Sequence, residues 1–211
     1  MLSIVLLLSL QQGQLDRVPA DVRTVVDSVS ASALARGLPA DPLIQKAIEG
    51  SAKGVPSQRV IAAVRLVAEQ LDTSAAALRA GGMIADTLVI SAGAFALNAG
   101  MSARDITALL LRAGGQTAGN VRIELNVAGT LVALGVPSAE AANLVSASIG
   151  SGRPATELLT LPGRVQAEVT RGATPAQAAA GLARAAAAQA RHGPPPTHPE
   201  HPPHPPAPPH P

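Results

Sequence analysis

The sequence predicts an all-α protein, built as stacked helical hairpins or as a compact orthogonal helical bundle, with a disordered Pro/His-rich C-terminal tail. Three observations predict this fold class. Apolar residues recur at helical spacing, a glycine-centred junction returns five times, and no run of alternating apolar and polar residues is bounded by hairpin turns. The 211 residues suit one domain of ordinary size. We place this helical domain at 14–191, between an N-terminal segment at 1–13 and the tail at 192–211.

The chain opens with MLSIVLLLSL, an apolar run that is followed directly by polar QQGQLDR. The run has the length of a signal-peptide core and falls short of the about 20 residues of a membrane span. No Lys or Arg precedes it and no clean A-x-A cleavage site follows it, so a buried first helix or strand is the alternative. We expect a signal peptide over 1–13, and therefore a periplasmic or secreted protein with no stable membrane span after its removal.

Four stretches of the helical domain carry apolar residues at the i, i+3, i+4, i+7 spacing of a helix with one buried face. The stripes are Val22, Val25, Val26 and Val29; Val60, Ile61, Val64 and Leu71; Ile106, Leu109, Leu110 and Ala113; and Leu131, Val132 and Leu134. The segment at 120–129 alternates briefly and is the best strand candidate. Because it continues into TLVALGV, we expect a helix there, capped by Asn120. Glycine-rich loops are expected at 79–86 and 113–120.

A short junction separates the helical stretches, and it combines Gly, an apolar residue and then Pro, Ser or Thr. It reads ARGLP at 35–39, AKGVP at 52–56, NAGMS at 98–102, ALGVP at 133–137 and TRGAT at 170–174. Gly in the left-handed conformation ends a helix, and the apolar residue after it packs back on the last turn. The next helix then starts at Pro, Ser or Thr, with Ser102–Asp105 and Thr174–Gln177 as capping-box pairs. The pattern predicts seven to ten helices joined by tight turns.

The segment ALARGLPADPLIQKAIEGSAKGVPSQRVIAAVR, at 33–65, carries two of these junctions. It resembles uncharacterised exported bacterial proteins that are built of helical hairpins with such G-[LV]-P junctions and whose function is unknown. The later GVPSAEAANLV and GATPAQAAAGLA resemble them more weakly. The resemblance implies an all-α fold and export, and it carries no activity and no catalytic residues.

The composition excludes several classes of function. The chain has 1 Phe and no Trp, Tyr or Cys, so the core must be aliphatic, and disulfides, thiolate nucleophiles and cysteine–zinc sites cannot form. The 16 basic and 14 acidic residues are interspersed and give a net charge of +2. Without a basic block or stacking aromatic residues, nucleic-acid binding is not expected.

Histidine is absent from the helical domain, which removes Ser-His-Asp catalysis and histidine-based metal sites from it. We therefore expect no enzyme and no cofactor. The aspartates Asp16, Asp21, Asp41, Asp72 and Asp86 are expected at helix starts, where carboxylates cap or meet the helix dipole. The glutamates Glu49, Glu69, Glu124, Glu140, Glu157 and Glu168 are expected on solvated helix faces near Lys or Arg.

Asp86 precedes the most apolar segment of the domain, which runs from Thr87 to Ala99. At about 13 residues this segment is too short to span a membrane and is expected to be a core helix. Asp86 is expected to cap that helix; a buried carboxylate at this position would instead be a functional candidate.

The tail contains all 5 histidines of the chain, His192, His198, His201, His204 and His210. Their separations are multiples of three, so in a polyproline II helix they would share one edge, with neighbours about 9 Å apart. Two nitrogens bound to one zinc ion must lie within about 3–4 Å of each other. Tight chelation by one tail is therefore not expected. Weak zinc, copper or nickel binding at His198, His201 and His204 is the alternative to a solvated spacer.

Together these features favour a non-enzymatic exported helical-repeat protein that acts as a structural or protein-interaction module with a protein partner. The alternative is a protein that handles divalent metals weakly through its histidine-rich tail. An enzyme with a carboxylate-only site or a bound cofactor would need two carboxylates that converge on a pocket.

The metal hypothesis predicts a difference between the full-length chain and a chain that ends at Arg191. Zinc, copper and nickel titrated calorimetrically into both should bind the full-length chain alone, because truncation removes every imidazole. Equal binding by the two chains, or binding by neither, would exclude a metal function of the tail.

Overall fold

The structure, a computed structural model, describes residues 18–84, 86–114 and 116–192. These residues form nine α-helices, one 3-10 helix and no strand, which confirms the predicted all-α class. The elements are α2 (Ala20–Ala35), α3 (Asp41–Ala52), α4 (Ser57–Ala80), α5 (Thr87–Asn98), α6 (Ala103–Ala113), α7 (Ala118–Ala133), α8 (Ser138–Gly150), η1 (Ala155–Thr160), α9 (Leu161–Thr170) and α10 (Pro175–His192). The predicted signal peptide at 1–13 and the candidate metal ligands His198, His201 and His204 lie outside the described residues.

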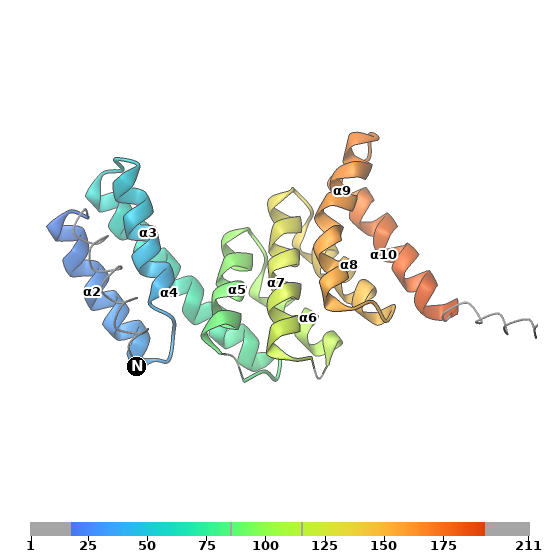
Figure 1. Cartoon of the computed structure of the whole chain (residues 1–211), viewed down its shortest axis with the longest axis horizontal. Helices are drawn as coiled ribbons and strands as arrows, with labels where there is room; N and C mark the ends of the chain where they lie inside the picture. Colours follow the sequence, from blue (N-terminus) through green and yellow to red (C-terminus); the bar gives the residue numbers. More distant parts are fainter. Residues whose placement is uncertain (1–17, 85, 115, 193–211) are drawn as a thin grey trace, which may run out of the picture.

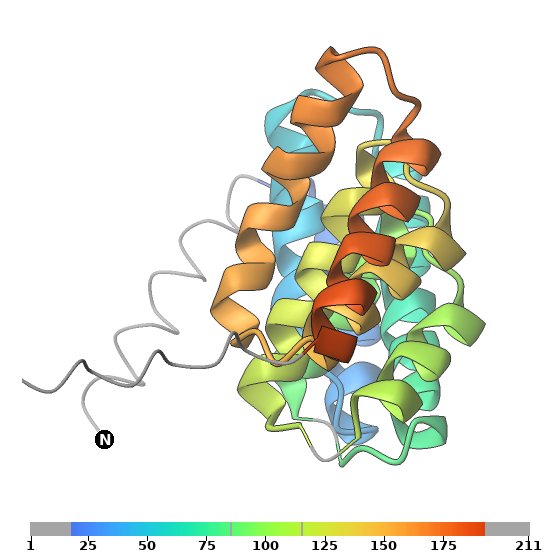
Figure 2. The ribbon, with the colours of Figure 1, turned by 90° about the vertical axis from the view of Figure 1, so that its right-hand side faces the viewer.

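The helices are arranged in two layers that run along the long axis of the molecule (Figures 1 and 2). In one layer α2, α4, α6, α8 and α10 contact one another in that order. In the other, α5 packs on α7 and α7 packs on α9, while α3 packs on both α2 and α4. Consecutive helices therefore alternate between the layers, and of the two predicted arrangements the chain adopts stacked helical hairpins.

Six helices end in the same glycine closure. At the end of α2, the Leu38 N–H donates to the Ala33 carbonyl at 3.0 Å and the Gly37 N–H donates to the Leu34 carbonyl at 2.9 Å. These paired bonds define a Schellman motif, and Gly37 has the positive φ of +75° that it requires. The same pair of bonds closes helices at Gly54, Gly82, Gly100, Gly135 and Gly172. All five predicted glycine closures are confirmed, although Pro39 precedes the Ala40 cap of α3 and does not start that helix. Gly82 adds a sixth closure inside a segment that we expected to be a loop.

The predicted capping residues are confirmed at the two junctions that carry Ser or Thr. Thr174 and Gln177 form a complete capping box: the Thr174 N–H donates to Gln177 Oε1 at 3.0 Å, and the Gln177 N–H donates to Thr174 Oγ1 at 3.2 Å. Ser102 Oγ accepts the Asp105 N–H at 3.1 Å. The Ser102 N–H, however, donates to Ser138 Oγ of α8 at 3.0 Å rather than to Asp105. At the Ser102 junction, a residue of the neighbouring hairpin therefore completes the cap.

Three predicted helix starts are wrong. The cap of α7 is Thr117, whose Oγ1 accepts the Asn120 N–H at 3.3 Å, so Asn120 lies in the first turn. Ala40 rather than Asp41 occupies the cap position of α3. Asp72 lies inside α4, because the buried stripe of that helix continues past it through Ala75 and Leu78.

The core is aliphatic, as the composition predicts. The largest fully buried apolar side chains are Leu43, Leu71, Leu78, Ile106, Leu109, Leu125, Leu131, Leu144 and Leu158. The segment after Asp86 is a core helix, α5, with Val89, Ile90, Ala92 and Ala96 buried. In the described part of the chain, no helix combines the length and the apolar composition needed to cross a membrane.

Small residues allow α5 and α7 to pack closely. A Cβ atom added at Gly129 of α7 would lie 2.9 Å from the Ala96 Cα and 2.9 Å from the Phe95 ring, both on α5. Gly93 of α5 similarly leaves room for Ser74 of α4, which is buried and donates to the Ile90 carbonyl at 2.8 Å. Neither position has space for a larger side chain unless the helices move apart.

Gly129→Ala is expected to destabilise the protein by about 1–3 kcal/mol, because the added methyl group meets backbone that cannot move independently. Gly181→Ala in α10 is the matched control, since a Cβ there has no neighbour within 4 Å. It should stabilise the protein by up to about 1 kcal/mol through helix propensity. Urea denaturation measures both effects, and equal stability of Gly129→Ala and the unmodified protein would contradict the close packing.

Candidate functional site

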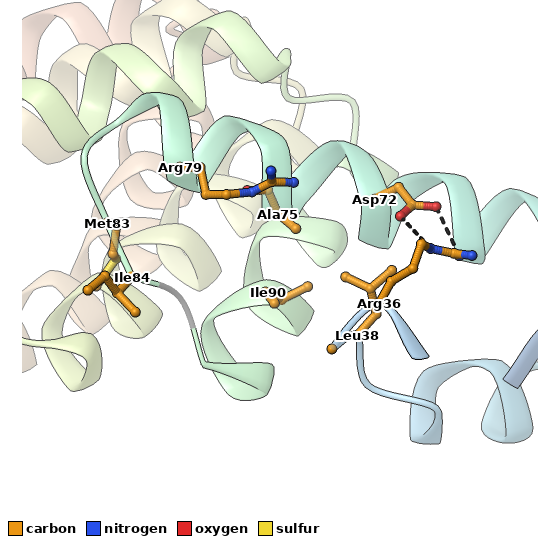
Figure 3. Close-up of a pocket in the computed structure, with 9 residues that line it drawn as sticks. Arg36, Leu38, Asp72, Ala75, Arg79, Met83, Ile84 and Ile90 are labelled. Atoms are coloured by element: carbon orange, nitrogen blue, oxygen red, sulfur yellow. Dashed lines mark hydrogen bonds and ion pairs between the residues drawn. The ribbon is translucent and has the colours of Figure 1, made fainter. Parts of the chain in front are cut away.

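A hollow with an apolar floor lies between the first two hairpins. Its volume is about 500 Å³, which is within the usual range of binding sites. The lining residues are Arg36, Gly37, Leu38, Asp72, Ala75, Arg79, Met83, Ile84 and Ile90. Figure 3 shows them on α4, on α5 and on the two connections that follow α2 and α4. We call this feature the inter-hairpin groove. It exists because the glycine closures at Gly37 and Gly82 turn the chain at the same edge of the molecule.

An ion pair closes one end of the inter-hairpin groove (Figure 3). Arg36 Nε lies 3.1 Å from Asp72 Oδ1, and Arg36 Nη2 lies 3.2 Å from Asp72 Oδ2, while Nη1 donates to Ser32 Oγ at 2.6 Å. This bidentate geometry orients the guanidinium. Both side chains remain about half exposed (44% and 50%), so the pair contributes little stability. It joins α4 to the C-terminal end of α2 and neutralises Asp72.

Arg79 lies on the α4 wall of the groove and extends back along that helix (Figure 3). Its Nε donates to the Ala75 carbonyl at 3.1 Å. None of the ion pairs found between described residues includes Arg79. The groove thus offers a guanidinium whose Nε is held in place and whose Nη groups can still donate to an anion.

The opposite end of the groove is apolar. Met83 is half-buried, and Ile84, which follows it, is 99% exposed. Met83 also lines a smaller hollow of about 120 Å³, with Leu110, Gln116 and Val121 on its other side. A concave surface therefore continues past the connection between α4 and α5 toward the next hairpin.

Glu124 is the carboxylate that the sequence analysis placed wrongly. We expected it on a solvated face, but its side chain is fully buried in α7, which packs on α5, α8, η1 and α9. Neither carboxylate oxygen has a hydrogen-bond partner among the described residues. Burial raises the pKa of Glu124 to about 7, because the charged form loses its hydration. The signal was present in the sequence: Glu124 stands three residues after Val121 and seven before Leu131, on the apolar stripe.

Other carboxylates have the structural roles that we expected. Asp86 is exposed and caps α5, accepting the Leu88 and Val89 N–H groups at 2.9 Å each. Glu49 is bound by Lys53 Nζ at 2.5 Å and by Lys46 Nζ at 2.9 Å. The hydrogen bonds from Lys53 and Lys46, followed by their charges, lower the pKa of Glu49 to about 2. Neither carboxylate converges with a second one on a cavity.

The inter-hairpin groove was not predicted from the sequence. The missed signal is the GGMI segment at 81–84, in which two apolar residues follow the glycines although a Schellman closure packs back only one. Among the described residues, no three His, Cys, Asp or Glu side chains lie close enough together to hold a metal ion. The metal prediction for His198, His201 and His204 falls on residues outside the described ranges and stays a prediction.

Comparisons with known proteins provide no further assignment. No family model matches the chain, and searches of curated proteins and of solved structures found no match.

Glu124 should make the free energy of unfolding depend on pH. The folded chain keeps the Glu124 proton up to about pH 7, whereas the unfolded chain releases it near pH 4.5. The contribution of Glu124 to the free energy of unfolding is therefore most favourable below pH 4.5. As the pH rises from 4.5 to about 7, the free energy of unfolding should fall by on the order of 3 kcal/mol.

Glu124→Gln tests this linkage, because glutamine has a similar size and no charge. The variant should be more stable than the unmodified protein by about 2–3 kcal/mol at pH 8, and by less than about 1 kcal/mol at pH 5. Urea denaturation at both pH values measures the difference. Glu69→Gln, at an exposed position of α4, is the control and should retain the original pH profile. A Glu124→Gln effect that is equal at the two pH values would contradict the shifted pKa.

Proposed function

We propose that the chain is a non-enzymatic, exported helical-repeat protein that acts as a protein-interaction module. The positions of the glycine closures support the repeat. The interval between Gly100 and Gly135 is 35 residues, and the interval between Gly135 and Gly172 is 37 residues. Both intervals have the length of a two-helix unit. From Gly54 to Gly100 is 46 residues, because α4 alone has 24 residues. Stacked hairpins of this kind present extended surfaces suited to binding other proteins.

The observation that carries the proposal is the inter-hairpin groove. It combines an apolar floor from Leu38 and Ile90, an exposed apolar side chain at Ile84 and the guanidinium of Arg79. A concave, mostly apolar hollow with a few polar groups is typical of a binding site. The absence of histidine and cysteine from the sequence before His192 favours binding over catalysis.

Export is the second part of the proposal, and it rests on the apolar run of the first ten residues. A periplasmic or extracellular partner is therefore the one to seek. N-terminal sequencing of the protein recovered from the producing cells would locate any cleavage.

Site-specific photo-crosslinking tests the interaction. A photoreactive amino acid is placed at position 84 in the groove of the full-length chain, or at position 159 in η1, where Leu159 is an exposed apolar residue of another hairpin. After irradiation of the producing cells, position 84 should give a discrete crosslinked product that position 159 does not. No product at either position, together with a defined catalytic turnover by the purified chain, would contradict the proposal.

A further inference from the structure

The inter-hairpin groove contains a charge pattern that specifies its partner more closely than the general proposal does. The charged lining residues are Arg36, Asp72 and Arg79. Arg36 and Asp72 neutralise each other through their bidentate ion pair. Arg79 remains as a net positive charge beside an apolar floor.

The geometry of Arg79 favours a carboxylate as the group it binds. Its Nε is already committed to the Ala75 carbonyl at 3.1 Å, which fixes the plane of the guanidinium along α4 (Figure 3). The remaining Nη donors can bind two oxygens of one planar anion. Since the adjoining wall consists of Met83, Ile84 and Ile90, the carboxylate must belong to a molecule that is otherwise largely apolar.

The extent of the surface favours a peptide over a small molecule. Met83 lines both the inter-hairpin groove of about 500 Å³ and the next hollow of about 120 Å³. The two hollows follow the edge where α2, α4 and α6 end. A chain lying across Met83 would occupy both of them. Gln116 lines the second hollow; its Oε1 accepts from Asn120 Nδ2 at 2.8 Å, and its NH2 group can donate to a peptide carbonyl.

We infer that the inter-hairpin groove binds an extended segment of a partner protein that presents apolar side chains to Leu38, Met83, Ile84 and Ile90 and an Asp or Glu carboxylate to Arg79. This inference rests on the proposed interaction function and names the chemistry of the partner. The apolar contacts supply the affinity, and the single ion pair fixes the register of the segment on the groove.

Peptide display tests the inference with the full-length protein as the target. A random library of 12-residue peptides is selected for binding, and the enriched peptides are synthesised with a fluorescent label. They should combine apolar residues with at least one Asp or Glu, and their binding should weaken as the salt concentration rises. Enriched peptides without an acidic residue would overturn the inference, as would the absence of any enriched peptide.

Matched variants then locate the binding site by fluorescence polarisation. Arg79→Gln should weaken binding about tenfold or more, since it removes a charge-assisted hydrogen bond, and Ile84→Ser should weaken it about fivefold. Arg65→Gln, an exposed arginine elsewhere on α4, and Leu159→Ser are the controls and should bind like the unmodified protein. Circular dichroism and thermal melting verify that each variant is folded.

The outcomes separate this inference from the proposed function. Acidic peptides that bind Arg79→Gln and Ile84→Ser as tightly as the unmodified protein would overturn the assignment to the groove, while the interaction function would still be decided by photo-crosslinking. Anionic phosphatidylglycerol vesicles are the comparison ligand. Arg79-dependent binding to the vesicles without Arg79-dependent binding to peptides would overturn the inference in favour of a lipid surface.

Discussion

The left-handed glycine that closes six of the helices is the constraint on which the stacking of the hairpins depends. At Gly37, the positive φ of +75° allows Leu38 to bond back to Ala33 and to bury its side chain against the last turn. These contacts fix the direction in which the chain leaves α2, so α3 begins within a few residues and packs on it. Because the closure returns at Gly54 and Gly82, the direction of each following helix is set in the same way.

A regular closure brings equivalent positions of neighbouring helices together. Ser57 Oγ lies 3.4 Å from Asp21, Arg36 pairs with Asp72, and Arg153 donates to Gln189 at 2.8 Å. The partners of each pair are separated by 36 residues in the sequence. These exposed bonds contribute little energy individually. They lie between successive helices of one layer, whereas α5 and α7 of the other layer meet through Gly129 and Ala96.

Two features arise where stacking leaves an ionisable side chain without an ion-pair partner among the described residues. Glu124 is buried because α7 has neighbours on several sides, and no donor from those helices reaches its carboxylate. Arg79 and Ile84 lie where two glycine-closed connections diverge and leave a groove between them. The raised pKa of Glu124 is expected to couple the stability of the array to pH, and the groove is the surface that we propose for a partner. The two features lie on different helices and respond to different variants.

The sequence by itself determined the elements of this protein that depend on short-range physics. Helical spacing located the core stripes, and the junction glycines located five closures, because a Schellman motif is built from residues within one turn. The same reasoning found the Thr174–Gln177 box. The tertiary structure decided whatever depends on a distant partner. Ser138 completes the cap at Ser102 from the next hairpin, neighbouring helices bury Glu124, and the inter-hairpin groove joins Arg36 and Arg79 across two hairpins. Helical spacing places Glu124 on the apolar stripe, but it does not identify the partner in any of these contacts, since they exist only once the hairpins have stacked.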